Sequence, residues 1–127
     1  MHKNVDNLIV IENLLKKKTN RENIPNIIAI SKTFPMSDIM PLIKHGHINF
    51  GENKIQEALD KWSSIKTQFT NIQLHMVGKL QTNKVKFLLP LFDYLHSLDN
   101  LKLAKKIAEQ EKKNNKKIKI FIQVNIG

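Results

Sequence analysis

Residues 48–77, INFGENKIQEALDKWSSIKTQFTNIQLHMV, decide the fold, because two strand patterns in this stretch are separated by one helical pattern. The stretch begins and ends with short apolar runs, whereas Ile55, Ala58 and Trp62 recur at the three- and four-residue spacing of one helix face. A helix between two strands of one sheet returns the chain to the same end of the sheet, so the strands must be parallel. The stretch therefore predicts a β-α-β unit.

The same alternation of strand and helix patterns continues on both sides of this unit. Strands are predicted at residues 27–31, 48–51, 73–77, 94–98 and 118–126, with a helical stripe between each consecutive pair. A further helix, with Val5, Leu8 and Ile11 on one face, precedes the first strand. Three polar residues stand at expected N-cap positions and one glycine at an expected helix end: Ser37, Thr82, Asp99 and Gly46. The pattern predicts an α/β protein with about five parallel strands and an extra N-terminal helix.

Alternate residues of the predicted strands separate an apolar face from a more polar one. In the last strand the apolar face carries Ile118, Ile120, Ile122 and Val124, and the opposite face carries Lys119, Phe121, Gln123 and Asn125. An open sheet with helices on both sides would be apolar on both faces. We therefore expect the (β/α)8 TIM-barrel type, in which helices cover the outside and polar groups lie toward the mouth.

The length limits how much of such a barrel this chain contains. A complete (β/α)8 barrel typically needs about 250 residues, and this chain has 127. We therefore expect a partial barrel, formed by a single domain over residues 1–127 that is truncated after the fifth strand. Its first and fifth strands would be unpaired edges, which are prone to aggregation.

The composition excludes several functions. No cysteine is present, which excludes disulfide scaffolds and thiolate zinc sites, and no metal site is expected. The net charge of +10 leaves a lysine-rich nucleic-acid binder as an alternative, but only Arg21 among the 21 basic residues is an arginine, so we expect no specific nucleic-acid partner. No apolar run is long enough to span a membrane, and no signal-peptide cleavage site is recognisable. We expect a cytoplasmic protein without a membrane partner.

Lys32 is the first candidate functional residue. The segment IIAISKTFP (27–35) places it just beyond the first strand, on the same face as Ile28 and Ile30. A lysine in a barrel mouth is expected to be partly desolvated, which lowers its pKa and exposes the neutral amine that forms an imine with an aldehyde. By position alone an ordinary solvated lysine is the stronger alternative, because 20 of the 21 basic residues are lysines.

Asn53 and His75 are further candidates, each with a structural alternative. Asn53 follows a strand, so it either caps the next helix, with Glu57 and Lys61 as an exposed pair, or presents its amide at the carboxyl edge of the sheet. His75 lies within a strand, where a hydrogen-bonded core histidine is about twice as common as a functional one. The residues alone leave both alternatives open.

Five motifs occur in one order along the chain: SKT at 31–33, FGEN at 50–53, HMVGKLQTNK at 75–84, HSLD at 96–99 and QVN at 123–125. Together they resemble the pyridoxal phosphate homeostasis protein family, also called the proline synthetase co-transcribed family, which is similar to the N-terminal barrel domain of alanine racemases. The resemblance implies that pyridoxal 5'-phosphate (PLP) is held as a Schiff base on Lys32. It also implies that Asn53, His75 and Asn125 lie around this cofactor.

The resemblance implies a role in intracellular PLP homeostasis rather than an enzyme with turnover, and it assigns no catalytic residue. Members of the family lack the second domain and the catalytic tyrosine of alanine racemases, although a PLP-dependent enzyme of that type remains the alternative. PLP-dependent apoenzymes are candidate partners, and no motif specifies an oligomeric state. The family holds the phosphate group with loops of the C-terminal half, so we expect weak PLP binding by this chain alone.

Overall fold

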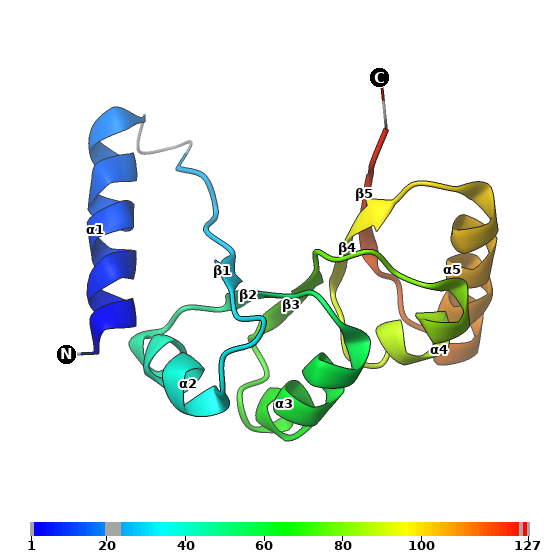
Figure 1. Ribbon diagram of the computed structural model, residues 1–127, viewed down its shortest axis with the longest axis horizontal. Helices are drawn as coiled ribbons and strands as arrows, with labels where there is room; N and C mark the ends of the chain where they lie inside the picture. The colour runs from blue at the N-terminus through cyan, green and yellow to red at the C-terminus, as the bar shows by residue number, and fades with distance from the viewer. Residues whose placement is uncertain (1, 20–23, 125, 127) are drawn as a thin grey trace.

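The computed structural model describes residues 2–19, 24–124 and 126, and its helices and strands alternate as the sequence predicts (Figure 1). The elements in chain order are α1 (Lys3–Lys18), β1 (Ala29–Ile30), α2 (Met36–His45), β2 (Asn49–Glu52), α3 (Ile55–Gln68), β3 (Gln73–Met76), the 3-10 helix η2 (Thr82–Lys84), α4 (Val85–Leu88), β4 (Tyr94–Leu98), α5 (Leu101–Asn114) and β5 (Lys119–Ile122). Every predicted strand overlaps an observed one, although β1 is shorter than the predicted 27–31 and β5 shorter than the predicted 118–126. The predicted α/β class is confirmed.

The strands form one five-stranded sheet in the sequential order β1-β2-β3-β4-β5. Each neighbouring pair is parallel. A doubly wound sheet reverses its strand order at a switch point, whereas consecutive strands of a (β/α) barrel are added on one side only. In Figure 1, α2, α3 and α4 lie in a row along one side of the sheet. The sequential order confirms the expected partial barrel.

The hydrophobic core lies between the sheet and these helices. Phe50 of β2 and Leu74 of β3 are completely buried, as is Trp62 of α3. The rings of Phe50 and Trp62 lie 5.0 Å apart, centroid to centroid. Burying a large apolar side chain contributes roughly 1.5–3 kcal/mol, so Phe50 and Leu74 determine which face of β2 and β3 turns toward the helices.

The predicted helix ends agree with the structure less well than the predicted helices and strands do. Gly46 ends α2 with a left-handed φ of 105°, as predicted. The predicted N-cap Asp99 is wrong, because Asn100 caps α5 by accepting a hydrogen bond from the Leu103 amide at 2.8 Å. Ser37 and Thr82 are likewise wrong as caps, since both lie inside their helices. Neighbouring polar residues suit a cap equally well, and only the backbone conformation selects one of them.

The last strand departs from the expected packing. Ile118 is buried, but Ile120 is 36% exposed, and Ile122 and Val124 are each 72% exposed. These side chains share the strand face that was expected to pack against helices. β5 is an edge strand, and within the described part of the chain no helix follows it to cover that face. Across the same residues, no helix is both long and apolar enough to span a bilayer.

Candidate functional site

The carboxyl ends of the five parallel strands meet at one edge of the sheet, where parallel α/β folds place their ligands. Lys32 follows β1 at this edge and Asn53 follows β2. A hollow of about 380 Å³ lies at the same edge and is lined by Val77, Lys79, Ser97, Asp99 and Gln123. The structure thus brings two of the predicted site residues to neighbouring strand ends, while the hollow lies at the ends of β3, β4 and β5 along the same edge.

Lys32 lies in the turn that connects β1 to α2, and its side chain is exposed. The expectation that Lys32 is partly desolvated is therefore wrong for this structure. Desolvation needs neighbouring strands on both sides of the mouth, and β1 is an edge strand paired only with β2. The amine is instead directly accessible to a ligand from solvent.

The turn that carries Lys32 is anchored by a lysine of α3. Lys61 Nζ donates hydrogen bonds to the carbonyl oxygens of Ser31, at 2.6 Å, and Phe34, at 2.9 Å. The same ammonium lies 2.9 Å from the Oε2 atom of Glu52. Lys61 therefore joins both ends of the Lys32 turn to the end of β2.

Glu52 lies beneath this turn and is completely buried on the helix side of the sheet. Its Oε2 atom accepts hydrogen bonds from Ser31 Oγ, at 2.5 Å, and from Trp62 Nε1, at 3.1 Å. A buried carboxylate is stable only when it is paired and hydrogen-bonded, and Lys61 supplies the opposite charge. Glu52 thus connects the core of the protein to the Lys32 turn.

Glu57 holds the turn from a second point on α3. Its Oε1 atom accepts a hydrogen bond from the Thr33 amide and lies 3.3 Å from Lys61 Nζ. The hydrogen bond from Thr33, together with the Lys61 ammonium, lowers the pKa of Glu57 below its ordinary value of 4.5. The sequence-based alternative of an exposed Glu57–Lys61 pair is therefore wrong, because both side chains bind the Lys32 turn. The four-residue spacing of Glu57 and Lys61 indicates from the sequence that the two side chains can pair on a helix, but it does not show which other groups they contact.

Asn53 is not the cap of α3. Lys54 occupies the N-cap position, and no side chain caps the helix there. A Cβ atom at Gly78 would overlap both the side-chain oxygen and the backbone carbonyl of Asn53. The absence of a side chain at Gly78 therefore lets Asn53 lie against the end of β3, which supports its predicted place at the carboxyl edge.

Apolar side chains line the inner face of the sheet next to this edge. A Cβ atom at Gly51 would lie 2.9 Å from Cδ1 of Ile30, 3.2 Å from Cγ2 of Ile28 and 3.4 Å from Cγ1 of Val77. Ile28 and Ile30 therefore share the inner face with the middle of β2, as the sequence predicted. Ile30 is 47% exposed there, so the inner face presents an apolar surface next to the sheet edge.

His75 is placed deeper in the sheet than the edge residues. Its register partner on β2 is Gly51, which pairs with Ile30, so Lys32 lies two residues further along and roughly 7 Å away in the strand direction. The ring of His75 stacks on Tyr94 at 4.2 Å. His75 thus belongs to the inner face, although not to the exposed edge.

Both ring nitrogens of His75 are occupied by protein groups. Nδ1 lies 2.9 Å from Nε2 of His96, and Nε2 lies 3.0 Å from Oδ1 of Asn49. Burial first, and then the neighbouring His96, lower the pKa of His75 from 6.5 to about 4. His75 is therefore hydrogen-bonded within the sheet, as one of the two sequence-based alternatives expected. Both of its ring nitrogens already contact protein groups.

Asn125 lies outside the described residues, so its place at the site stays a prediction. In the part of the chain that is described, no group of three or more His, Asp or Glu side chains could hold a metal ion. The sequence gives no role to Glu52 and predicts Glu57 and Lys61 only as an exposed pair, whereas all three hold the Lys32 turn.

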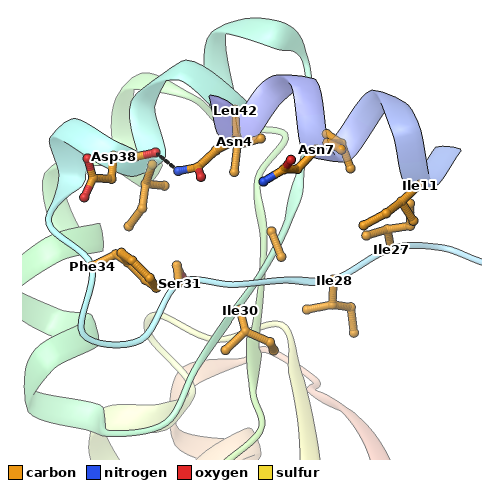
Figure 2. Close-up of a pocket in the computed structure, with 13 residues that line it drawn as sticks. Asn4, Asn7, Ile11, Ile27, Ile28, Ile30, Ser31, Phe34, Asp38 and Leu42 are labelled. Atoms are coloured by element: carbon orange, nitrogen blue, oxygen red, sulfur yellow. Dashed lines mark hydrogen bonds between the residues drawn. The ribbon is translucent and has the colours of Figure 1, made fainter. Parts of the chain in front are cut away.

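An apolar cavity of about 260 Å³ lies on the other side of β1, between α1, α2 and residues 27–34 (Figure 2). Asn4 and Asn7 of α1 and Asp38 of α2 border it, and Asn4 Nδ2 donates a hydrogen bond to the Asp38 carbonyl at 3.1 Å. Lys32, Asn53 and His75 do not line this cavity, whereas Ile28 and Ile30 line it. The cavity is therefore next to the sheet-edge site but contains none of its three described polar candidates.

Comparison with known sequences confirms the resemblance that the motifs indicate. A pyridoxal phosphate homeostasis protein of Haemophilus influenzae is 34% identical to this chain over 117 residues, which cover 92% of this chain and 49% of the relative. The protein of that name from Escherichia coli strain K12 is 35% identical over 102 residues, 80% of this chain and 44% of the relative. The chain spans about half the length of the curated relatives it matches. No protein-family model matches the chain.

Solved structures show the same fold. The structure of PipY from Synechococcus elongatus without PLP superposes with a TM-score of 0.83 at 29% identity, covering 95% of this chain and 53% of PipY. The structure of PipY with PLP bound gives a TM-score of 0.74 at 31% identity, covering 84% of this chain and 51% of PipY. This chain is therefore similar, over most of its length, to a protein whose structure contains PLP.

Proposed function

We propose that this chain binds pyridoxal 5'-phosphate as a Schiff base on Lys32 and takes part in PLP homeostasis. One observation carries the proposal: the exposed amine of Lys32 lies in an anchored turn at the carboxyl edge of a fold similar to PLP-bound PipY. The names of the curated relatives support the same role.

The residues at this edge fit an aromatic aldehyde. The cofactor supplies an electrophilic aldehyde carbon, and the Lys32 amine supplies the nitrogen that replaces its oxygen, with loss of one water molecule. Ile28, Ile30 and Val77 offer an apolar surface for a ring, and the Asn53 amide offers both a donor and an acceptor. His75, which the resemblance places around the cofactor, is oriented by its hydrogen bonds to Asn49 and His96.

The bond to Lys32 is reversible, because water or a second amine can displace the lysine nitrogen. A carrier needs this reversibility in order to deliver the cofactor to PLP-dependent apoenzymes, which are the partners we propose. The proposed role includes no catalytic turnover. A single alanine-racemase N-terminal-like domain over residues 1–127, weak PLP binding by this chain alone and a cytoplasmic location stay predictions.

Titration of the chain with PLP tests this function. Imine absorbance should appear, and borohydride reduction followed by peptide mass spectrometry should place the adduct on Lys32. Lys32→Ala should abolish the adduct. Lys79→Ala is the matched control, because Lys79 is also an exposed lysine at the carboxyl edge, and this variant should retain the adduct. Equal labelling of many lysines, or an unchanged adduct in Lys32→Ala, would show that Lys32 has no special role.

A further inference from the structure

We infer that Lys61 is a positioning residue for Lys32, acting with Glu52 and Glu57 to hold the turn that presents the Lys32 amine. The role of the Lys32 amine in this inference rests on the proposed function. The anchoring of the turn does not, because its hydrogen bonds can be tested without any ligand.

Lys61 bridges the two ends of the turn. One ammonium group binds the carbonyl oxygen of Ser31, immediately before Lys32, and that of Phe34, two residues after it. The three hydrogens of a lysine ammonium can serve these two carbonyls and Glu57 Oε1, at 3.3 Å, while the Glu52 carboxylate lies 2.9 Å away as the opposite charge. A single side chain thus sets the distance between the end of β1 and the residues that lead into α2.

The backbone within the turn needs such support. Thr33 has a φ of 65°, in the left-handed region that a β-branched residue rarely adopts. Backbone conformations of this kind persist only where surrounding contacts hold them in place. The Thr33 amide donates to Glu57, so the strained residue itself is bound between the two carbonyls that Lys61 holds.

Two of the three charges in this cluster, those of Lys61 and Glu52, are well protected from water, whereas the Glu57 side chain is 27% exposed. The Lys61 side chain is only 13% exposed, and Glu52 is completely buried. Hydrogen bonds between charged groups strengthen as water is excluded. The cluster therefore forms a rigid base beneath an exposed lysine, and it keeps the amine at the sheet edge while leaving its tip free.

A second lysine of α3 provides a matched control. Lys66 is similarly placed, with its side chain 18% exposed, and it binds the Leu91 carbonyl and Asp93 Oδ2, both at 2.7 Å. Lys61 and Lys66 therefore each anchor a loop from the same helix, Lys61 the loop after β1 at the carboxyl edge of the parallel sheet and Lys66 the loop before β4 at the amino edge. Only Lys61 contacts the Lys32 turn, so the two substitutions separate a positioning effect from a general loss of stability.

The experiment compares Lys61→Met with Lys66→Met in the full chain. Amide hydrogen exchange at Thr33 and the dissociation constant for PLP are measured in both. We expect Lys61→Met to speed exchange at Thr33 and to weaken PLP binding, each by about tenfold or more, the factor expected for a hydrogen bond to a charged group. Lys66→Met should change neither. Equal exchange rates at Thr33 in the two variants would overturn the inference.

Substitutions at Glu57 decide the inference if Lys61→Met fails to fold. Glu57→Ala removes the acceptor for the Thr33 amide and should speed its exchange, whereas Glu57→Gln keeps an acceptor oxygen and should restore it. No change in Glu57→Ala would overturn the inference. If the unsubstituted chain binds no PLP, the proposed function fails, and hydrogen exchange at Thr33 alone then decides whether Lys61 and Glu57 hold the turn.

Discussion

Nδ1 of His75 and Nε2 of His96 lie 2.9 Å apart on the inner face of the sheet. One of these nitrogens must donate a proton and the other must accept it, so the hydrogen bond requires at least one neutral ring. Burial lowers the pKa of both histidines, which favours the neutral forms. This pair therefore makes the inner face sensitive to acid.

The first prediction concerns the pH dependence of stability. The pKa of His75 falls from 6.5 to about 4 on folding, so the unfolded chain binds the proton more tightly and acid favours unfolding. The free energy of unfolding should decrease as the pH drops from about 6.5 to 4, by roughly 3 kcal/mol from this group. Residue-specific NMR titration should give a midpoint for His75 near 4, and a midpoint near 6.5 would contradict the role of burial.

A second prediction follows from the contact between Asn53 and Gly78. Gly78→Ala would overlap the Asn53 backbone and side chain, so we expect a loss of roughly 1–3 kcal/mol in the free energy of unfolding. Gly46→Ala is the control, because the space around Gly46 is empty and only its left-handed backbone opposes a side chain, at a cost of about 1 kcal/mol. Urea unfolding followed by Trp62 fluorescence measures both. Weaker PLP binding is expected only in Gly78→Ala.

The third prediction tests Asp93 as a connection between elements. Its Oδ2 atom accepts hydrogen bonds from Lys66 Nζ, at 2.7 Å, and from the Leu74 amide, at 2.8 Å. Asp93→Ala should reduce the free energy of unfolding by about 2–3 kcal/mol, because both donors lose a charged acceptor. Asp93→Asn, which keeps one acceptor oxygen, should lose less. Equal losses in urea unfolding would show that the charge, rather than the acceptor, matters.

The fourth prediction concerns the exposed edge formed by β5. Ile122 is 72% exposed on an edge strand that pairs with β4 on one side only, and edges of this kind promote pairing between molecules. Ile122→Lys should reduce self-association in light scattering while changing the free energy of unfolding by less than about 0.5 kcal/mol. The matched substitution Ile107→Lys places a charge in the core and should unfold the protein. Unchanged light scattering in Ile122→Lys would exclude β5 as the associating surface.

Part of the candidate site was visible in the sequence because it depends on position along a strand. Lys32 and Asn53 directly follow predicted strands, and parallel strands place such residues at one edge. The network that holds Lys32 was not visible in this way. Lys61 binds carbonyl oxygens about 30 residues earlier in the chain, and backbone carbonyls leave no signature in the side-chain pattern.

The sequence by itself determined the order of the elements and the face that β2 and β3 turn to the helices, because local hydrophobic spacing is sufficient for both. Only the tertiary structure decided which charges are buried and which are free. Glu52 and Lys61 look like ordinary surface residues in the sequence, yet they are shielded from water, whereas Lys32 and Ile122 are exposed. Burial depends on which segments far apart in the chain pack together, and β1 and β5 are edges of an open sheet.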